Sequence, residues 1–591
     1  MKWNLDNIYK SFDSKEYIND FKNLNNNIEN LKQFINSDLW ESSDEEFMPF
    51  FEDVILKYEE IENFYNKMQC FIFLKLSCNS SDKLAIDMEL KLRDLHVNVV
   101  LIEANLIKNL SKRKEEIDFS KSSVLKEYEF FIKEMLSEGK HLLSDEVEET
   151  MASLYNYGAY SFSTLQEALV SKYKVSIEKD GEIKEIPLTE CRSLLDNDCS
   201  EIRIKAIEAE KRLYRFMEEP IAFALNNIKK SVIYDTKKRG YKSPLSRSLK
   251  QNRISEEIFD ALIGAIEESL PFFREFLKLK AKLMGNENGR IPFRDLFAST
   301  LKTNKKVDFQ FAQKFLIENF YSFSKEFGEF VENAFKNNWI DSEIYEGKVG
   351  GAFCDFISDI NESRILLNFS NSYDSVFTLA HELGHAYHGE TLKNERIFNK
   401  HYPMVIAETA SIFSETLICD KAYSIGDETE KIIILEYELN SAAQTIVDIY
   451  SRFLFEKEVF DRCENEFLTP KDLNKIMKNA QKATYGDAMD EEYFEQAWIY
   501  KSHYYMVNNN FYNYPYAFGH LFSLGLYNIY LNNPNDFNSK YNLILRNSGK
   551  KNLKEIGEMC SLDLNKKQFF LNSINILKSK FLKYKELVSK M

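Results

Sequence analysis

The chain has 591 residues, of which 44% are hydrophobic and 29% are charged, and this composition excludes an intrinsically disordered protein. Its 93 acidic and 77 basic side chains give a formal net charge of −16, so we expect neither nucleic acid nor a membrane surface as a partner, because phosphate binding needs a basic surface. Only 19 Gly and 10 Pro residues are present, which excludes an all-β fold rich in tight turns and favours long helices.

Helical periodicity dominates the N-terminal part of the chain. Residues 51–77 and 83–110 repeat apolar side chains at three- and four-residue spacing, with no interior Gly or Pro. A predicted hairpin follows at 173–188, where Asp180 and Gly181 supply the turn. Helical patterning resumes at 191–217 and 256–284. We therefore predict a helical N-terminal domain, residues 1–185, followed by a second domain, residues 186–591.

The second domain contains one region in which the helical period fails. Two predicted strands, Ala352–Ile357 and Arg364–Phe369, flank a polar turn there. From Asp374 onward we expect helices again. The first twenty residues lack the apolar core of a signal peptide, and no apolar run is long enough to cross a bilayer. The eight cysteines show no paired spacing, which favours reduced thiols, so we expect a cytoplasmic protein.

The stretch "LAHELGHAYH" fits the pattern HExxH with His381, Glu382 and His385. Residues four apart lie on one face of a helix, so both imidazoles can reach one Zn²⁺ at about 2.0–2.1 Å. Glu382 can then hold the water that the metal activates. The apolar residues around the histidines predict a buried helix, in which imidazoles and carboxylates need partners.

A third zinc ligand is expected in the downstream stretch "YPMVIAETASIFSETLIC". Pro403 stands where a helix would begin, and Glu408 falls in the middle of the apolar run that follows. A buried carboxylate is costly unless it meets a cation, so we predict Glu408 as the third ligand. Glu415, two helical turns further on, is placed to accept a hydrogen bond from a ligand imidazole. An ordinary half-exposed glutamate is the alternative for Glu415.

The stretches "DSVFTLAHELGHAYH" and "AETASIFSE" resemble the M3 family of zinc metallopeptidases, specifically its oligoendopeptidase F (PepF) branch. The segments "WNLDNIY", "LLSDEVEETMASL", "LNNIKKSVIYDTKKRGYKSPLSRSL" and "KVGGAF" resemble the same branch in the same order. Matched residue by residue, the resemblance implies His381, His385 and Glu408 as zinc ligands and Glu382 as the general base. It also implies a mainly α, two-lobed zincin-type fold that encloses a deep channel, with a small β-sheet beside the zinc helix.

The resemblance further implies hydrogen-bond donors for the oxyanion in the segment "SHYYMVNNNFYNYPYAFGH". The family places a His and two Tyr in a comparable segment, which suggests His503, Tyr512 and Tyr516. Core packing is the alternative for each tyrosine. Tyr514 is a further candidate, as a substrate contact.

A glycine pair precedes the first predicted strand of the second domain. Gly350 and Gly351 resemble the family's glycine-bearing segment beside an edge strand, to which an extended peptide could add through backbone hydrogen bonds. Both glycines are therefore candidate substrate-binding residues, because a residue without a side chain lets the peptide approach closely.

These features together predict a zinc-dependent oligoendopeptidase, with one Zn²⁺ per chain, that hydrolyses internal bonds of short unstructured peptides. Zinc would activate a water, and Glu382 would take its proton and deliver it to the leaving amine. Two alternatives remain: a helical zinc carboxypeptidase that removes single C-terminal residues, and a non-catalytic helical peptide-binding protein whose zinc site is vestigial. The sequence leaves the oligomeric state and the cleavage preference open.

Overall fold

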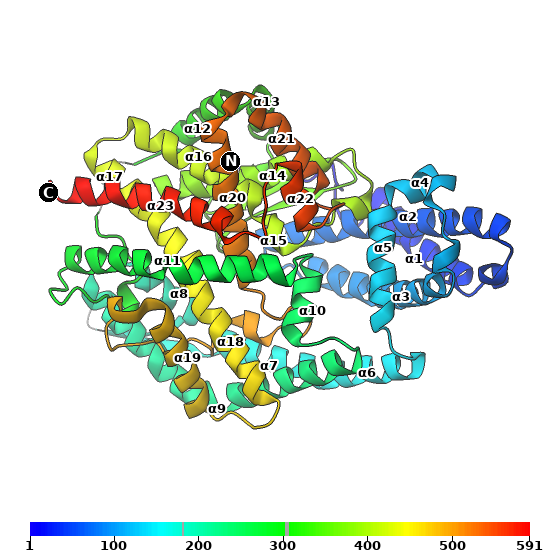
Figure 1. Cartoon of the computed structure of the whole chain (residues 1–591), viewed down its shortest axis with the longest axis horizontal. Coiled ribbons are helices and arrows are strands. Elements are labelled where there is room, and N and C mark those ends of the chain that lie inside the picture. Colours follow the sequence, from blue (N-terminus) through cyan, green and yellow to red (C-terminus); the bar gives the residue numbers. More distant parts are fainter. Residues whose placement is uncertain (180–181, 302–305) are drawn as a thin grey trace.

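A computed structural model describes residues 1–179, 182–301 and 306–591, and this part of the chain is mainly helical (Figure 1). The α-helices are, in chain order, α1 (Lys15–Ile35), α2 (Asp44–Cys78), α3 (Lys83–Lys112), α4 (Ser123–Glu127), α5 (Glu129–Glu138), α6 (Asp145–Tyr157), α7 (Ala159–Lys172), α8 (Leu188–Ser193), α9 (Ser200–Lys238), α10 (Pro244–Gln251), α11 (Glu256–Leu283), α12 (Phe309–Phe323), α13 (Lys325–Lys336), α14 (Tyr373–Leu392), α15 (Met404–Ala407), α16 (Thr409–Ile425), α17 (Glu428–Ala442), α18 (Ile449–Cys463), α19 (Pro470–Tyr485), α20 (Tyr514–Asn532), α21 (Pro534–Asn547), α22 (Leu553–Met559) and α23 (Lys567–Val588). The prediction of a mainly α protein is confirmed.

The predicted hairpin is present as two antiparallel strands, β1 (Lys174–Lys179) and β2 (Glu182–Pro187). Its expected turn residues, Asp180 and Gly181, lie outside the described residues. Alternating burial explains the pairing, because Val175, Ile177 and Ile186 turn toward the core while their neighbours face solvent.

A second small sheet has the strand order β3-β5-β4, with β3 (Ile340–Asp341), β4 (Ala352–Ile357) and β5 (Glu362–Leu367). The predicted bounds of β4 are confirmed. The second predicted strand begins and ends two residues earlier than expected, because Ile357 pairs with Glu362 across a short turn and sets the antiparallel register. Within the described sheet β4 is an edge strand, so one side of its backbone is unpaired.

The buried apolar side chains form two clusters. The smaller cluster joins residues between Leu5 and Met135, from the helices at one end of the molecule, to Ile357, Ile397 and Phe398 (Figure 1). The larger one contains most of the buried apolar residues from Ala159 onward, including residues of β1 and β2. The clusters thus divide between residues 135 and 159, and the boundary expected at residue 185 stays a prediction.

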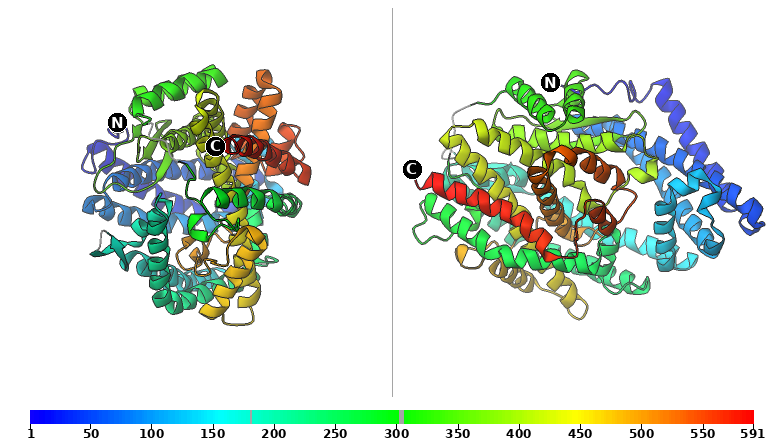
Figure 2. Two further views of the ribbon diagram at one scale, coloured as in Figure 1. Left: turned by 90° about the vertical axis from the view of Figure 1, so that its left-hand side faces the viewer. Right: turned by 45° about the horizontal axis from the view of Figure 1, so that its top comes forward.

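Helix α14 lies against α16 on one side and against β4 and β5 on another, while the C-terminal helix α23 runs beside α11 and α20 (Figure 2). Helix α14 approaches α16 closely at Gly384, where an added Cβ would lie 2.5 Å from the Ala410 carbonyl oxygen. The apolar residues that surround the motif in the sequence are buried on all sides of α14, as expected for a helix that is apolar all round.

The expectation of helices throughout the region after Asp374 is wrong for residues 489–513. This segment contains only one short 3-10 turn, Ser502–Tyr505. Helix α19 ends at Gly486, whose φ of 53° is a left-handed conformation that glycine adopts without strain. Over the described ranges, no helix is both long and apolar enough to span a bilayer.

Candidate metal centre

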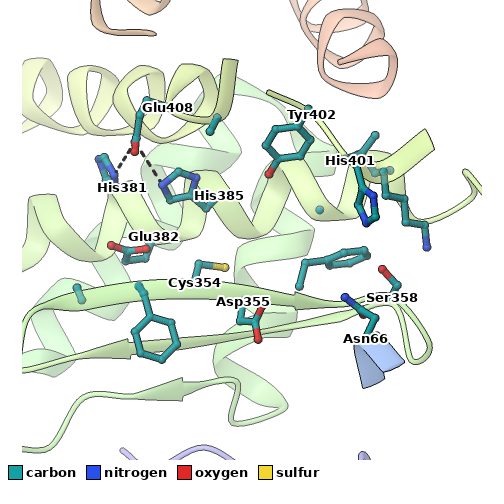
Figure 3. A pocket seen from close by; sticks show the side chains of 17 residues that line it. Asn66, Cys354, Asp355, Ser358, His381, Glu382, His385, His401, Tyr402 and Glu408 are labelled. Atoms are coloured by element: carbon teal, nitrogen blue, oxygen red, sulfur yellow. Dashed lines mark ion pairs between the residues drawn. The ribbon is translucent and has the colours of Figure 1, made fainter. Parts of the chain in front are cut away.

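Three predicted ligands meet at one point between α14 and the start of α16 (Figure 3). His381 and His385 stand one turn apart on α14, with ring centroids 4.9 Å from each other. One carboxylate oxygen of Glu408, Oε2, lies 3.2 Å from His381 Nε2 and 3.4 Å from His385 Nε2. The helix spacing of the motif therefore places both imidazoles opposite a single carboxylate.

The apolar run led us to expect Glu408 within a continuous helix, and this expectation is wrong. It stands at the junction of α15 and α16, with φ −83° and ψ 2°. The break directs its side chain toward α14. Ser411 donates a hydrogen bond of 2.8 Å from Oγ to Glu408 Oε2, a contact that our sequence analysis missed. Its position three residues after Glu408, on the same helical face, is the only signal of this contact in the sequence.

The second predicted carboxylate, Glu415, also reaches α14. Its Oε2 lies 2.8 Å from His381 Nδ1, so that the other ring nitrogen, Nε2, faces Glu408. Tyr437 of α17 hydrogen-bonds to Glu415 in turn. A carboxylate that accepts a hydrogen bond from a ligand imidazole orients the ring and increases its basicity.

The electrostatics of the centre are dominated by these carboxylates. Burial alone would lower the pKa of His381, but hydrogen bonds with Glu408 and Glu415 raise it well above the usual value. Burial also raises the pKa of Glu382, and the charges of the two imidazoles oppose that shift only in part. The centre thus combines two imidazoles with several acidic groups in a partly buried site, an environment that stabilises a cation.

The donor set fits a zinc ion. Two imidazole nitrogens and one carboxylate oxygen, all within 4.8 Å of one another, are borderline ligands of the kind Zn²⁺ prefers. Tetrahedral coordination at about 2.0–2.1 Å separates neighbouring ligand atoms by about 3.3 Å. The observed 3.2 and 3.4 Å between Glu408 and the two imidazoles agree with that value.

Glu382 lies on the side of the histidines that faces β4 (Figure 3). It is 5% exposed, and within the described residues its Oε2 has no hydrogen-bond partner. A buried carboxylate oxygen without a partner is rare and indicates a missing polar ligand. A cavity of about 710 Å³ opens beside it, and its wall includes Asn66 of the N-terminal helix α2 as well as Cys354, Asp355, Tyr402 and the metal-centre residues.

The predicted donors His503, Tyr512 and Tyr516 form a cluster of rings. The centroid of His503 lies 4.9 Å from that of Tyr512 and 6.3 Å from that of Tyr516. Tyr512 precedes α20, so the two tyrosines do not share a helical face. Gly519 allows α20 to pack on Glu408, since its Cβ would lie 3.0 Å from Glu408 Cβ, and this packing brings Tyr516, one turn earlier, near the centre. Burial raises the pKa of Tyr516, which keeps its hydroxyl protonated as a donor.

Tyr514 does not suit the role of a substrate contact. Its side chain is 1% exposed and lies edge-on to Phe259, 5.2 Å between centroids. Its hydroxyl donates to the Ser248 carbonyl oxygen at 3.3 Å. Tyr514 begins α20 on the face that packs into the core, whereas Tyr516 is directed toward the opposite side of that turn.

The glycines predicted to admit a peptide precede the edge strand. Gly351 has a φ of 80°, and no described atom beyond the adjacent residues lies within 4 Å of the position that a Cβ would take at Gly350 or at Gly351. The backbone beside β4 is therefore open at this end of the strand.

A mainly helical fold in which an HExxH helix and a following glutamate assemble three ligands defines the class of HExxH metalloproteins, to which many zinc peptidases belong. The chain belongs to peptidase family M3, because the family model described as Peptidase family M3 matches residues 193–576. A second model, described as Oligopeptidase F, matches residues 114–174.

Individual relatives agree with this assignment. The chain is 26% identical over 431 residues to oligopeptidase PepF of Bacillus subtilis, an alignment that covers 71% of this chain and 62% of the relative. The fold is similar to a solved protein of Chlamydophila abortus, with a TM-score of 0.80, 20% identity, and coverage of 99% and 98% of the two chains. It is also similar to oligoendopeptidase-F of Enterococcus faecium, with a TM-score of 0.72, 16% identity, and coverage of 98% and 99%.

Proposed function

We propose that this protein is a zinc-dependent oligoendopeptidase that hydrolyses internal bonds of short, unstructured peptides. One observation carries the proposal: the two imidazoles and Glu408 converge beside a buried Glu382 oxygen that has no partner in the described structure, at the wall of a cavity. Membership in peptidase family M3 supports it.

His381, His385 and Glu408 would hold the ion, with Glu415 and Ser411 fixing the orientation of the ligands. A zinc ion in this site supplies a Lewis acid that acidifies water and polarises a peptide carbonyl. Glu382 takes the proton of the attacking water on its unpartnered Oε2 and delivers it to the leaving amine. Burial favours this transfer, because it raises the pKa of the Glu382 carboxyl group.

Two further elements complete the proposed reaction. Tyr516 and His503, with Tyr512 beside them, donate hydrogen bonds to the negative charge that develops on the carbonyl oxygen. Gly350 and Gly351 let an extended peptide approach the free edge of β4 and pair with its backbone. The participation of α2 in the cavity wall supports the view that the N-terminal helices and the second domain enclose the substrate in a channel.

The decisive experiment compares two glutamate variants on α14. We expect Glu382→Gln to bind one zinc per chain but to lose about 10²–10⁴-fold in kcat, the contribution typical of a general acid–base group. Glu390→Gln, on the same helix and paired with Lys393, should retain activity. Chelation should abolish peptide cleavage by the wild type, and zinc should restore it. Normal cleavage by Glu382→Gln would refute the proposed base.

A further inference from the structure

A second cavity, of about 360 Å³, has an unusually basic wall. Four cationic and two acidic side chains line it, contributed by α8 and the turn after it, α18 and the turn before it, and the segments around residues 294 and 500: Arg192, Arg294, Arg452, Lys501, Asp196 and Asp448. We call this cavity the basic pocket. The wall holds two more cations than anions, although Arg294 also pairs with Glu492 outside it, and an anionic ligand would fit such a wall.

The arginines of the basic pocket are held in fixed orientations. Arg192 stacks on Tyr500, with its guanidinium carbon 3.6 Å from the ring centroid, and pairs with the buried Glu210. Arg452 pairs with Asp448 of the pocket wall. Each arginine carries five N–H donors in a planar fork, so one carboxylate partner leaves donors for a ligand.

Lys501 differs from these arginines because no hydrogen bond or ion pair of its ammonium is found in the described part of the chain. Its Nζ lies 4.8 Å from the centroid of Tyr500, the ring on which Arg192 also stacks. Burial lowers the pKa of Lys501, and the charges of Arg452 and Arg192 act in the same direction, while Tyr500 and Asp448 oppose the shift. A partly buried ammonium that makes no direct hydrogen bond or ion pair is unfavourable, and a bound carboxylate would relieve that cost.

The basic pocket adjoins the proposed oxyanion donors. Lys501 precedes His503 by two residues. Burial is the largest cause that lowers the pKa of His503, and the charges of Arg452 and Lys501 lower it further. On the other side, Asp196 of the pocket lies close enough to Asp374, in the first turn of α14, for its charge to raise the Asp374 pKa in addition to burial. The pocket therefore lies toward the N-terminal end of α14.

The direction of the edge strand indicates which end of a peptide reaches this pocket. Strand β4 runs in the same direction as α14: Cys354 lies near Glu382, and further along Phe356 packs against Gly389. A peptide that adds to β4 in the more stable antiparallel sense runs the opposite way. Its C-terminal part then extends toward the first turn of α14, and hence toward the basic pocket.

We infer that the basic pocket binds a substrate carboxylate, supplied by the free C-terminus of the peptide or by an acidic side chain near it. Lys501 is the counter-ion, and Arg192 and Arg452 donate hydrogen bonds beside it. The inference rests on the proposed function, and it adds a physical reason for the position of cleavage: the distance between the pocket and the metal centre sets how far from its bound carboxylate a peptide is cut.

The test uses three versions of one eight-residue peptide: a C-terminal acid, a C-terminal amide, and an amide with glutamate as the last residue. We expect the wild type to cleave the acid with a kcat/KM about tenfold to a hundredfold above that of the plain amide, as for loss of a charged hydrogen bond. Lys501→Met should bring the ratio of kcat/KM for the acid to kcat/KM for the amide down to about one, whatever its effect on the amide itself. Lys501→Arg should restore part of the preference, and Lys325→Met, at an exposed position of α13, should have no effect.

The third peptide separates the two sources of the carboxylate: rescue by the terminal glutamate shows that a side chain suffices, and lack of rescue assigns the pocket to the free C-terminus. Equal cleavage of acid and amide by the wild type, or an equal loss for both in Lys501→Met, would overturn the inference while the peptidase activity stands. A binding measurement tests the inference independently of cleavage: the fluorescence anisotropy of the labelled acid and of the labelled amide is measured with Glu382→Gln. Tighter binding of the acid would support the pocket even if no peptide is cleaved, and equal affinities would overturn it.

Discussion

The substitution Gly384→Ala tests the helix packing that assembles the metal centre. An added Cβ would lie 2.5 Å from the Ala410 carbonyl oxygen and 2.7 Å from Ser411 Cα, both backbone atoms that cannot rotate away. Since carbon atoms pack at about 3.5–4.0 Å, α14 and α16 would have to separate by about 1 Å. The histidine pair lies on α14, whereas Glu408 directly precedes α16 and Glu415 lies within it. Overpacking of this kind costs about 1–3 kcal/mol of stability.

A shift of about 1 Å in a catalytic site typically costs 10²-fold in rate, so we expect a loss of that size in kcat/KM together with weaker zinc binding. The matched control is Gly264→Ala in the interior of α11, where the added Cβ meets only the flexible Lys567 Cδ at 3.2 Å. That change should be neutral or stabilise the helix by up to about 1 kcal/mol. Thermal unfolding, zinc titration and peptide hydrolysis measure the three effects. Wild-type zinc affinity and activity in Gly384→Ala would refute the close packing.

Three further predictions follow from single residues. Tyr516→Phe should lower kcat about 10²–10³-fold in steady-state assays with metal content unchanged, whereas Tyr514→Phe should leave kcat near the wild-type value; equal losses would contradict the distinction. Gly351→Val should raise KM without loss of zinc, because valine is strained at a φ of 80° and blocks the strand edge; unchanged kinetics would exclude a peptide there. Burial lowers the pKa of His388 from 6.5 to about 3, so only the unfolded state gains its proton between these values. The free energy of unfolding should therefore fall as pH drops from 6.5 toward 3, by up to about 1.4 kcal/mol per unit, and urea titrations of His388→Gln should show a smaller slope than the wild type.

The candidate metal centre was the most predictable part of the molecule. The helix period alone places His381 and His385 on one face of α14, and Glu408 stood out as a carboxylate in an apolar run. The position of Glu408 was predicted inside a helix and is found at a helix junction. Ser411 was missed, since the geometry of a break is set by the packing of α15 and α20 around it.

The tyrosines illustrate the limit of local reasoning. Tyr514 and Tyr516 are two residues apart in one aromatic segment, and their roles separate only because α20 begins at Tyr514 and packs that ring against Phe259. The basic pocket had no local signal at all. Arg192, Arg452 and Lys501 come from segments separated by tens or hundreds of residues, and only the folded chain brings their charges to one wall.

By itself the sequence determined the helical class, through its apolar periodicity and its few glycines and prolines, and it determined the HExxH pair, because both depend on contacts within a few residues. Tertiary structure alone decided which buried polar groups of the described residues find partners and which, like Glu382 Oε2, do not. The physical reason is that burial and electrostatic pairing depend on distances through space. Residues far apart in the sequence come within such distances only when their helices pack.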